Sequence, residues 1–294
     1  MKQVKIITDS CSDLDAALRE QYGIDYVKMN VVIRGEEKPA NLDWELYSPK
    51  EFYDIMRGGE RITTTQVPAS EFIEVFEKYA GEGFDIVYIA CSAVLSGSVN
   101  TGIVVAKDIM EKYPDTNIIC IDSKNSCMGE GIIAIEAAKL AAEGRSAAEI
   151  AAAVDDMKLS VNQFAAVEKL DYLKRAGRVK ASSAFFGNLF GVKPIIISDA
   201  NGQNVAYTKV KGRSASIREC VNMLKDVIIE PEKQTLFVGH ADCVEAAEEL
   251  KALAEQELKP ADVHMGYIGP IIGASVGPGT IVIYGVGKKV DIQG

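Results

Sequence analysis

The feature that most restricts the fold is a regular alternation of short apolar runs with amphipathic segments through the first half of the chain. Strand-like runs occupy residues 4–8, 26–33, 84–90 and 117–121, and helical patterns occupy residues 12–22, 49–56, 68–79, 99–112, 131–142 and 147–158. Because parallel strands must be joined by a crossover, this alternation indicates right-handed βαβ units. We therefore predict a parallel sheet covered by helices on both faces.

The second half has a different rhythm. Strand-like runs at residues 193–198 and 203–210 flank Asp199-Ala200-Asn201-Gly202, whose Asn-Gly pair is typical of a hairpin. Further strands are expected at residues 162–167, 235–239, 264–267 and 281–285, and helices at residues 169–175, 214–227 and 245–257. A hairpin among βαβ units indicates a mixed sheet. We predict a two-domain α/β protein, with a parallel α/β/α domain at residues 1–159, a mixed-sheet α/β domain at residues 160–294 and a ligand in the interdomain cleft.

Composition excludes several classes of partner. The net charge of −10 argues against nucleic acid and anionic membranes. No apolar run approaches the ~20 residues that span a bilayer, and no secretory signal is seen, so we expect a cytoplasmic protein without membrane insertion. Six scattered cysteines read as reduced thiols, and with only two histidines, His240 and His264, we expect no metal site.

Hydroxyl-rich loops follow or precede the predicted strands of the first half. Asp9 and Ser10 end the first strand, Thr64 lies in Thr63-Thr64-Thr65-Gln66, and Ser96-Gly97-Ser98 separates a buried strand from a helix. Loops at the carboxyl ends of parallel strands meet in one crevice, where helix N-termini favour anions. These side chains predict a site for a small anionic head group, although turn and capping chemistry alone would also place Ser, Thr and Asp there.

Residues Gly273-Ala274-Ser275-Val276-Gly277 match the nucleophile elbow of serine hydrolases. That motif requires a strand–turn–helix context and a histidine later in the chain. Pro278-Gly279 and a strand-like run follow instead, and no histidine comes after Ser275. We therefore reject the hydrolase interpretation and expect no catalytic residues.

Several motifs together resemble the DegV family of bacterial fatty-acid-binding proteins, in family order over almost the whole chain. They are Ile7-Thr8-Asp9-Ser10-Cys11-Ser12-Asp13-Leu14, Thr64-Thr65-Gln66, Leu95-Ser96-Gly97-Ser98-Val99-Asn100, Ile121-Asp122-Ser123, Leu170-Asp171-Tyr172-Leu173-Lys174-Arg175-Ala176-Gly177-Arg178, Val192-Lys193-Pro194 and Gly273-Ala274-Ser275-Val276-Gly277-Pro278-Gly279. The resemblance implies that the chain binds a long-chain fatty acid.

The resemblance also implies roles for particular residues. Thr64, Ser96 and Ser275 would hold the carboxyl group, and Ser275 stands where the family usually carries a histidine. A separate ATP-binding fatty-acid kinase would phosphorylate the bound acid to an acyl-phosphate for phospholipid synthesis. Arg178, Lys211 and Arg213 would form its docking surface, with Lys211 where arginine is typical. For these basic residues a solvated helix end and hairpin arm is the simpler interpretation.

Two apolar, glycine-containing segments could line a pocket for the acyl tail, at residues 184–191 and 268–273. Core packing is the ordinary explanation of such runs.

Two alternatives to the fatty-acid carrier stay open. One is an enzyme acting on a small carboxylate or phosphate substrate, with Asp9 as general base and Ser10 or Ser96 in the anion pocket. The other is a binding protein for a different amphiphile, suggested by the serine at position 275. We favour the carrier over the enzyme, because the sequence has no histidine near those loops and no metal cluster. The absence of a nucleotide-binding loop fits a carrier without a cofactor rather than a kinase.

Overall fold

The computed structural model describes residues 2–185 and 191–293. The chain divides into two compact units, one formed by Met1–Glu45 and Thr64–Lys158 and the other by Leu46–Thr63 and Leu159–Gly294. Residues 46–63, which the sequence analysis assigned to the first half, therefore group with the second unit. The sequence prediction of a parallel sheet and a separate mixed sheet is confirmed.

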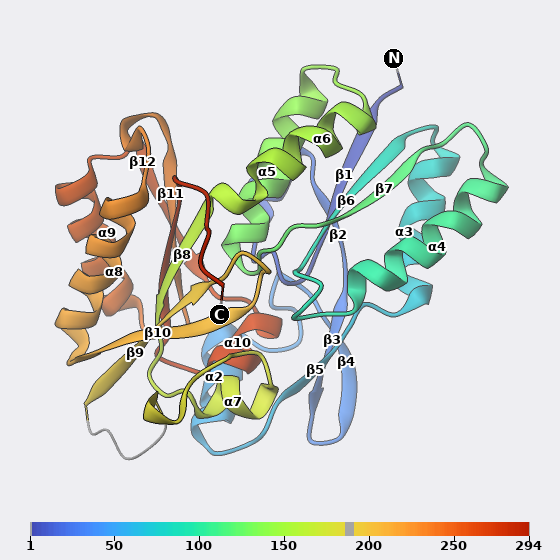
Figure 1. Ribbon diagram of the computed structural model, residues 1–294. Coiled ribbons are helices and arrows are strands. Elements are labelled where there is room, and N and C mark those ends of the chain that lie inside the picture. Colours follow the sequence, from blue (N-terminus) through green and yellow to red (C-terminus); the bar gives the residue numbers. More distant parts are fainter. Residues whose placement is uncertain (1, 186–190, 294) are drawn as a thin grey trace. The chain divides into compact units, whose positions relative to one another are not determined.

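A parallel sheet forms the centre of the first unit, with strand order β2-β1-β6-β7. Helices α3 and α4 cover one face and α5 and α6 the other (Figure 1). The strands are β1 (Val4–Asp9), β2 (Asp25–Val27), β6 (Asp85–Ala90) and β7 (Ile118–Asp122), and the helices are α1 (Ala16–Tyr22), α3 (Ala69–Gly81), α4 (Ser98–Lys112), α5 (Met128–Ala142) and α6 (Ala147–Met157). Strand β6 is buried along its whole length, as a strand covered on both faces must be.

A small sheet of order β4-β3-β5 accompanies the parallel sheet. Its strands are β3 (Met29–Ile33), β4 (Glu36–Ala40) and β5 (Thr63–Thr65). The sequence analysis predicted one strand over residues 26–33, but the chain leaves the parallel sheet after β2 and enters the small sheet with β3. Strand β4 was not predicted because its segment is highly charged. It is an edge strand of the small sheet, and Glu36, Glu37 and Lys38 face water.

A mixed six-stranded sheet forms the centre of the second unit, in the order β10-β9-β8-β13-β11-β12. Only β11 and β12 pair in parallel, and the other neighbours are antiparallel. The strands are β8 (Val161–Ala166), β9 (Val192–Ser198), β10 (Asn204–Lys211), β11 (Thr235–His240), β12 (Asp262–Tyr267) and β13 (Ile281–Val286). The predicted hairpin is confirmed, since β9 and β10 pair through Ser198 and Asn204 beside the Asn-Gly turn.

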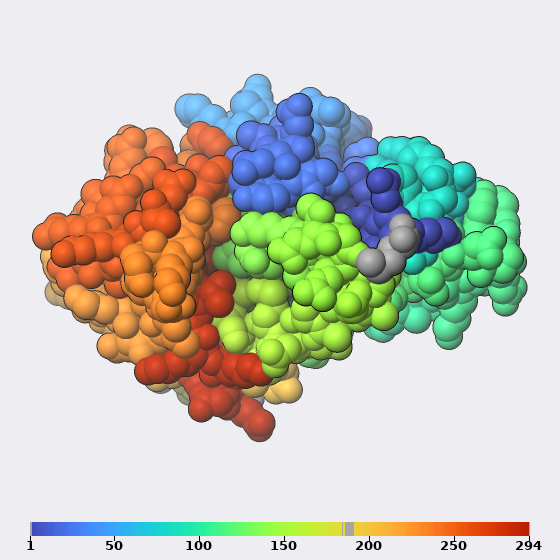
Figure 2. Space-filling model, turned by 90° about the horizontal axis from the view of Figure 1, so that it is seen from above, coloured from blue at the N-terminus to red at the C-terminus, as the bar shows by residue number. Residues whose placement is uncertain are grey.

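Two long helices, α8 (Arg213–Val227) and α9 (Val244–Leu258), pack against the mixed sheet and against each other. They form one continuous surface, orange in Figure 2. Beneath them lies an apolar core that includes Leu224, Leu250 and Ile283, all fully buried. Burial of such side chains contributes about 1.5–3 kcal/mol each. Helices α2 (Pro49–Arg57), α7 (Asp171–Ala176) and α10 (Pro270–Val276) and the short 3-10 turns η1 (Lys158–Ser160), η2 (Ser183–Phe185) and η3 (Pro231–Lys233) complete the unit.

Helix starts follow capping chemistry, with one correction to the predicted bounds. Helix α1 begins at Ala16 and not at residue 12, because the Asp15 side chain caps it by accepting a hydrogen bond from the Leu18 amide. Ser48 and Ser146 each form a capping box with a glutamate three residues later. Helix α10 was missed by the sequence analysis, although Gly269-Pro270 places a proline at its first position.

Candidate functional site

The carboxyl ends of β1, β6 and β7 lie at one edge of the parallel sheet, because all three strands run in the same direction. The loops that follow them begin at Ser10, Cys91 and Ser123. The Asp122 carboxylate at the end of β7 accepts a hydrogen bond from the Ala93 amide in the β6 loop. The structure thus brings the predicted Asp9-Ser10 and Ser96–Ser98 loops to one edge.

Asp9 joins two of these loops from below. Its Oδ1 accepts a hydrogen bond from the Cys11 amide, and its Oδ2 accepts bonds from the Tyr88 hydroxyl and the Cys91 amide, at 2.8 and 3.1 Å. The side chain is fully buried, and burial raises the pKa of its carboxyl group, opposed by these hydrogen bonds. Asp9 therefore holds the loops in position from inside the fold.

Ser10 joins the first loop to the small sheet. Its hydroxyl donates to the Ala40 carbonyl at 2.7 Å and accepts from the Met29 amide at 2.9 Å. Both partners belong to the strand pair β3–β4. Like Asp9, Ser10 is fully buried and positions the loop.

Thr64 is the middle residue of β5. Its neighbour Thr65 donates to the Glu37 carboxylate on β4, and Thr63 on that same face is exposed. Because successive side chains of a strand point to opposite faces, Thr64 faces the other way. It is half-buried, and its hydroxyl has no hydrogen-bond partner among the described residues. The Thr64 hydroxyl is therefore available to a ligand.

The Ser96-Gly97-Ser98 loop leads into α4. The two serine hydroxyls lie 2.9 Å apart, and Ser98 Oγ also accepts from the Val67 amide at 3.2 Å. Ser98 is fully buried, whereas Ser96 retains a 9% exposed fraction. Ser98 thus supports the loop, and Ser96 is the hydroxyl that reaches its surface.

Gln66 connects the threonine segment Thr63–Thr65 to the Ser96-Gly97-Ser98 loop and α4. Its side-chain amide donates to Thr101 Oγ1 on α4 at 2.8 Å, and its Oε1 lies where a Cβ on Gly97 would stand, 2.1 Å away. The absent side chain at Gly97 makes room for this contact. Gln66 therefore links the Thr64-Thr65-Gln66 segment to the Ser96-Gly97-Ser98 loop and the start of α4.

Ser275 lies in the last turn of α10, half-buried, and its hydroxyl has no hydrogen-bond partner within the described ranges. A serine inside a helix is not at the strand-to-helix turn that a nucleophile elbow needs, which agrees with the rejection of the hydrolase interpretation. Helix α10 packs on two tyrosines of the second unit. A Cβ on Gly273 would lie 2.4 Å from Tyr53 Oη, and one on Gly277 would lie 2.3 Å from the Tyr172 ring.

The three predicted basic residues differ in exposure to solvent. Arg213 begins α8 and is turned inward, donating to the Glu168 carboxylate at 2.9 Å and to the Gly279 carbonyl at 2.6 Å. Lys193 forms a second ion pair with Glu168. Arg178 and Lys211 are exposed. Arg213 therefore holds the turn that follows α10, whereas the other two face solvent.

The remaining sequence candidates have the following positions. Residues 186–190 of the first apolar segment lie outside the described residues. In the second segment, Ile268 and Ile271 are buried and belong to the turn and helix around α10. His264 lies on the edge strand β12 with its ring 5.6 Å from that of Phe237, as expected of an edge histidine.

One residue of the site region, Glu130, was missed by the sequence analysis. It lies in the first turn of α5, where an acidic residue is ordinary, so the sequence gives no signal of its burial. Its side chain is fully buried, and its Oε1 accepts a 2.7 Å hydrogen bond from Thr8. Burial and the nearby Asp9 raise the pKa of Glu130 well above its usual range.

Comparison with known proteins gives matches over nearly the whole chain. The model of the DegV family matches residues 3–287. A DegV domain-containing protein of Clostridium perfringens is 35% identical over 291 residues, which is 99% of this chain and 100% of that protein. No described helix is both long enough and apolar enough to cross a bilayer.

Solved structures share the fold. A DegV family protein from Thermus thermophilus, whose structure is described as showing fatty-acid binding, matches with a TM-score of 0.87 at 23% identity over 97% of this chain and 100% of that one. DegV from Bacillus subtilis, described as a fatty acid binding protein, matches with a TM-score of 0.82 at 26% identity over 98% and 100%.

Proposed function

This chain belongs to the DegV family, and from that membership we propose that it binds a long-chain fatty acid whose carboxyl group lies against the hydroxyl-bearing edge of the parallel sheet. The observation that carries the proposal is the joining of the Thr64 and Ser96 segments through Gln66 and Val67. Ser96 and Gly97 directly precede α4, whose N-terminal partial positive charge favours a carboxylate. Gln66 and Val67, which follow the Thr64 segment, bond to Thr101 and Ser98 of that helix.

The polar residues of the three loops have two different roles, which supports a binding site. Asp9, Ser10 and Ser98 are buried and bonded within the fold, so they fix the loops. Thr64 would donate to the ligand, and so would Ser96, whose hydroxyl accepts from the Ser98 amide at 3.3 Å and keeps its own hydrogen for a ligand when the Ser98 hydroxyl donates to it. We extend the proposal to Ser275, whose hydroxyl can donate to a carboxylate but, unlike histidine, cannot add a positive charge.

The affinity would come mainly from the tail. Each buried CH₂ contributes about 0.8 kcal/mol, so a long acyl chain binds tightly with few polar contacts. The hydroxyls would then select the carboxyl end and fix its position.

The same geometry gives less support to the enzyme alternative. A general base must reach the proton that it removes. Both oxygens of Asp9 accept hydrogen bonds from inside the fold, and the side chain is fully buried. Asp9 is therefore better suited to holding loops than to proton transfer.

We further propose that the chain presents the bound carboxyl group to a separate ATP-dependent kinase. The kinase would transfer the γ-phosphoryl group of ATP to a carboxylate oxygen, forming an acyl-phosphate and ADP. Arg178 and Lys211 are exposed and can meet an acidic or phosphate-bearing partner surface. Arg213 would contribute indirectly, by holding the Gly279 turn.

Fatty-acid affinity of three delipidated variants tests the head-group assignment. Thr64→Val and Ser96→Ala should each weaken binding about 5- to 10-fold, the loss expected for a net hydrogen bond of about 1–1.4 kcal/mol. Thr63→Val is the matched control, because Thr63 is on the exposed face of the same strand. The fatty-acid methyl ester should bind all four proteins alike. Equal affinity of the free acid for wild type and both site variants would contradict the assignment.

A further inference from the structure

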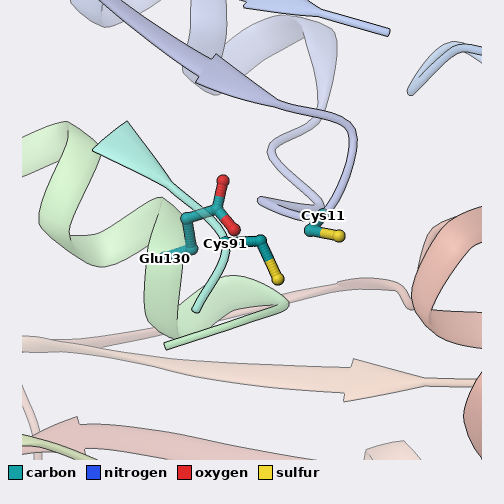
Figure 3. A group of neighbouring side chains, drawn as sticks. All are labelled: Cys11, Cys91 and Glu130. Carbon is teal, nitrogen blue, oxygen red and sulfur yellow. The ribbon is translucent and has the colours of Figure 1, made fainter. Parts of the chain in front are cut away.

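Two cysteines that are far apart in the sequence meet beneath the hydroxyl-bearing edge. Cys11 follows β1 and Cys91 follows β6, and Glu130 approaches from α5 (Figure 3). The two sulfur atoms and one carboxylate oxygen all lie within 4.8 Å of one another. Each of the three residues is at most 2% exposed. The sequence analysis expected no metal site because the cysteines are scattered along the chain. In the fold, however, two of them lie close together.

The carboxylate of this cluster is only half used. Glu130 Oε1 accepts from Thr8, whereas Oε2 is buried without a hydrogen-bond partner among the described residues. Burial and Asp9 raise the pKa of Glu130 well above its usual range, which favours the neutral acid. A buried polar atom without a hydrogen-bond partner is uncommon even then, so Oε2 points to a missing partner. Asp9 is a second buried acid beside it, and no described ion pair involves either acid. The cluster therefore gathers groups that can become negative, with no described positive side chain paired to them.

We propose that Cys11, Cys91 and Glu130 bind a single thiophilic metal ion. Thiolates and a carboxylate are established zinc ligands, at about 2.3 Å for sulfur and about 2.0–2.2 Å for oxygen. On binding, the two thiols and the carboxyl group would release their protons to solvent, and Glu130 Oε2 would gain the ion as its partner.

A fourth side chain, Met29, could distinguish a zinc site from a copper site. The Cys11 thiol lies 3.3 Å from the thioether sulfur of Met29, which is itself buried on β3. Thioethers are ligands for Cu(I), whereas zinc sites use Cys, His and carboxylate. If the ion is Cu(I), Met29 belongs to the site, and if it is Zn²⁺, Met29 only packs against it.

An ion in this position would join the loops after β1 and β6 to the start of α5. These are two of the loops that Asp9 also connects. The ion would therefore stabilise the loops that carry the proposed head-group site, without contacting the fatty acid. Because the cluster is buried, the ion would enter during folding or a local opening.

The test is refolding of the full-length reduced protein with Zn²⁺ or with Cu(I), removal of free ion, and measurement of bound metal. We expect one equivalent of one of these ions and a higher melting temperature than the metal-free protein. Cobalt refolded into the protein should show sulfur-to-metal charge-transfer absorption. These measurements on the wild-type chain need no variant to fold.

Variants then assign the ligands. Cys11→Ala and Cys91→Ala should each abolish stoichiometric binding, and Glu130→Gln, which can still accept from Thr8, should weaken it at least 10-fold. Cys120→Ala, on β7 in the same unit, is the control and should bind normally. Met29→Leu should weaken Cu(I) binding and leave Zn²⁺ binding unchanged. The proposal is overturned if wild type holds no more Zn²⁺ or Cu(I) than the Cys11→Ala protein, or if oxidation yields only a Cys11–Cys91 disulfide in a chain that binds neither ion.

Discussion

Each unit has a serine-containing segment that needs glycine. In the first unit it is Ser96-Gly97-Ser98 before α4, and in the second it is Gly273–Gly277 around Ser275. At each glycine another side chain occupies the space that a Cβ would need. At Gly97 the neighbour is the far end of a flexible glutamine. At Gly273 and Gly277 the neighbours are the rings of Tyr53 and Tyr172, and Tyr53 is fixed by a 2.6 Å bond to the Ile268 carbonyl. The first segment can therefore adjust to a ligand or a substitution, whereas the second is held rigidly.

The largest effect is expected for Gly277→Ala. Gly277 has φ +79°, and an added Cβ would meet the Tyr172 ring at 2.3 Å. We expect a loss of about 3 kcal/mol in the free energy of unfolding, the sum of overpacking and the strain of a backbone conformation, with ψ 164°, that is essentially restricted to glycine. Urea unfolding measures it.

Gly177→Ala shows the cost of an alanine at positive φ, there in the left-handed helical region, without a steric contact. Gly177 ends α7 with φ +70° and has nothing within 4 Å of an added Cβ. It should cost only about 1 kcal/mol. Equal losses at the two glycines would show that contact with Tyr172 is unimportant.

Gly273→Ala should cost about 2 kcal/mol through overpacking against Tyr53 Oη. Tyr53→Phe removes that oxygen together with its bond to Ile268, at a cost of about 1 kcal/mol. In the double variant the alanine should cost about 1 kcal/mol less than it does alone. Strictly additive losses in urea unfolding would argue against this contact.

Gly97→Ala should cost less than about 1 kcal/mol, because the new methyl group displaces only the Gln66 side chain and its bond to Thr101. In a Gln66→Ala background the same change should be nearly neutral. Fatty-acid affinity should fall in Gly97→Ala, since the two hydroxyl-bearing segments then lose the Gln66 link and keep only the bond from the Val67 amide to Ser98. A loss of stability as large as that of Gly273→Ala would remove the contrast between the two segments.

The smallest effect concerns pH and the second unit. Burial lowers the pKa of His240, opposed by Asp242 and Glu245, and its Nδ1 is buried without a partner among the described residues. The unfolded chain then binds a proton more readily than the folded one. This contribution to stability is complete above the unfolded pKa of about 6.5 and is lost as pH falls through the lower folded pKa, by at most about 1.4 kcal/mol per pH unit. His240→Gln should flatten the dependence of unfolding free energy on pH in this window, and an unchanged slope would contradict it.

Most of the fold could be predicted from the sequence because its signals are local. The hairpin at Asn201-Gly202 and the alternation of strands and helices follow from turn chemistry and hydrophobic period, and both are confirmed. Helix α10 was missed because it begins with a proline, contains Gly273 and ends at Gly277, residue types of low helix propensity. Strand β4 was missed because its side chains are mostly exposed.

The candidate site was only partly predictable. The motifs indicated Thr64 and Ser96, but not that Ser98, Ser10 and Asp9 are consumed by bonds inside the fold. Their partners are distant in sequence, and single-chain patterns carry no information on such contacts. For the same reason Glu130 looked like an ordinary first-turn acid, and the two cysteines looked unrelated.

The most direct measurement is denaturing extraction of the purified protein followed by mass spectrometry of the released lipid. Binding through the Thr64 and Ser96 edge predicts about one equivalent of a long-chain fatty acid, reduced in Ser96→Ala and retained in Thr63→Val. A protein that releases no lipid, and that takes up no added fatty acid after refolding, would contradict the account.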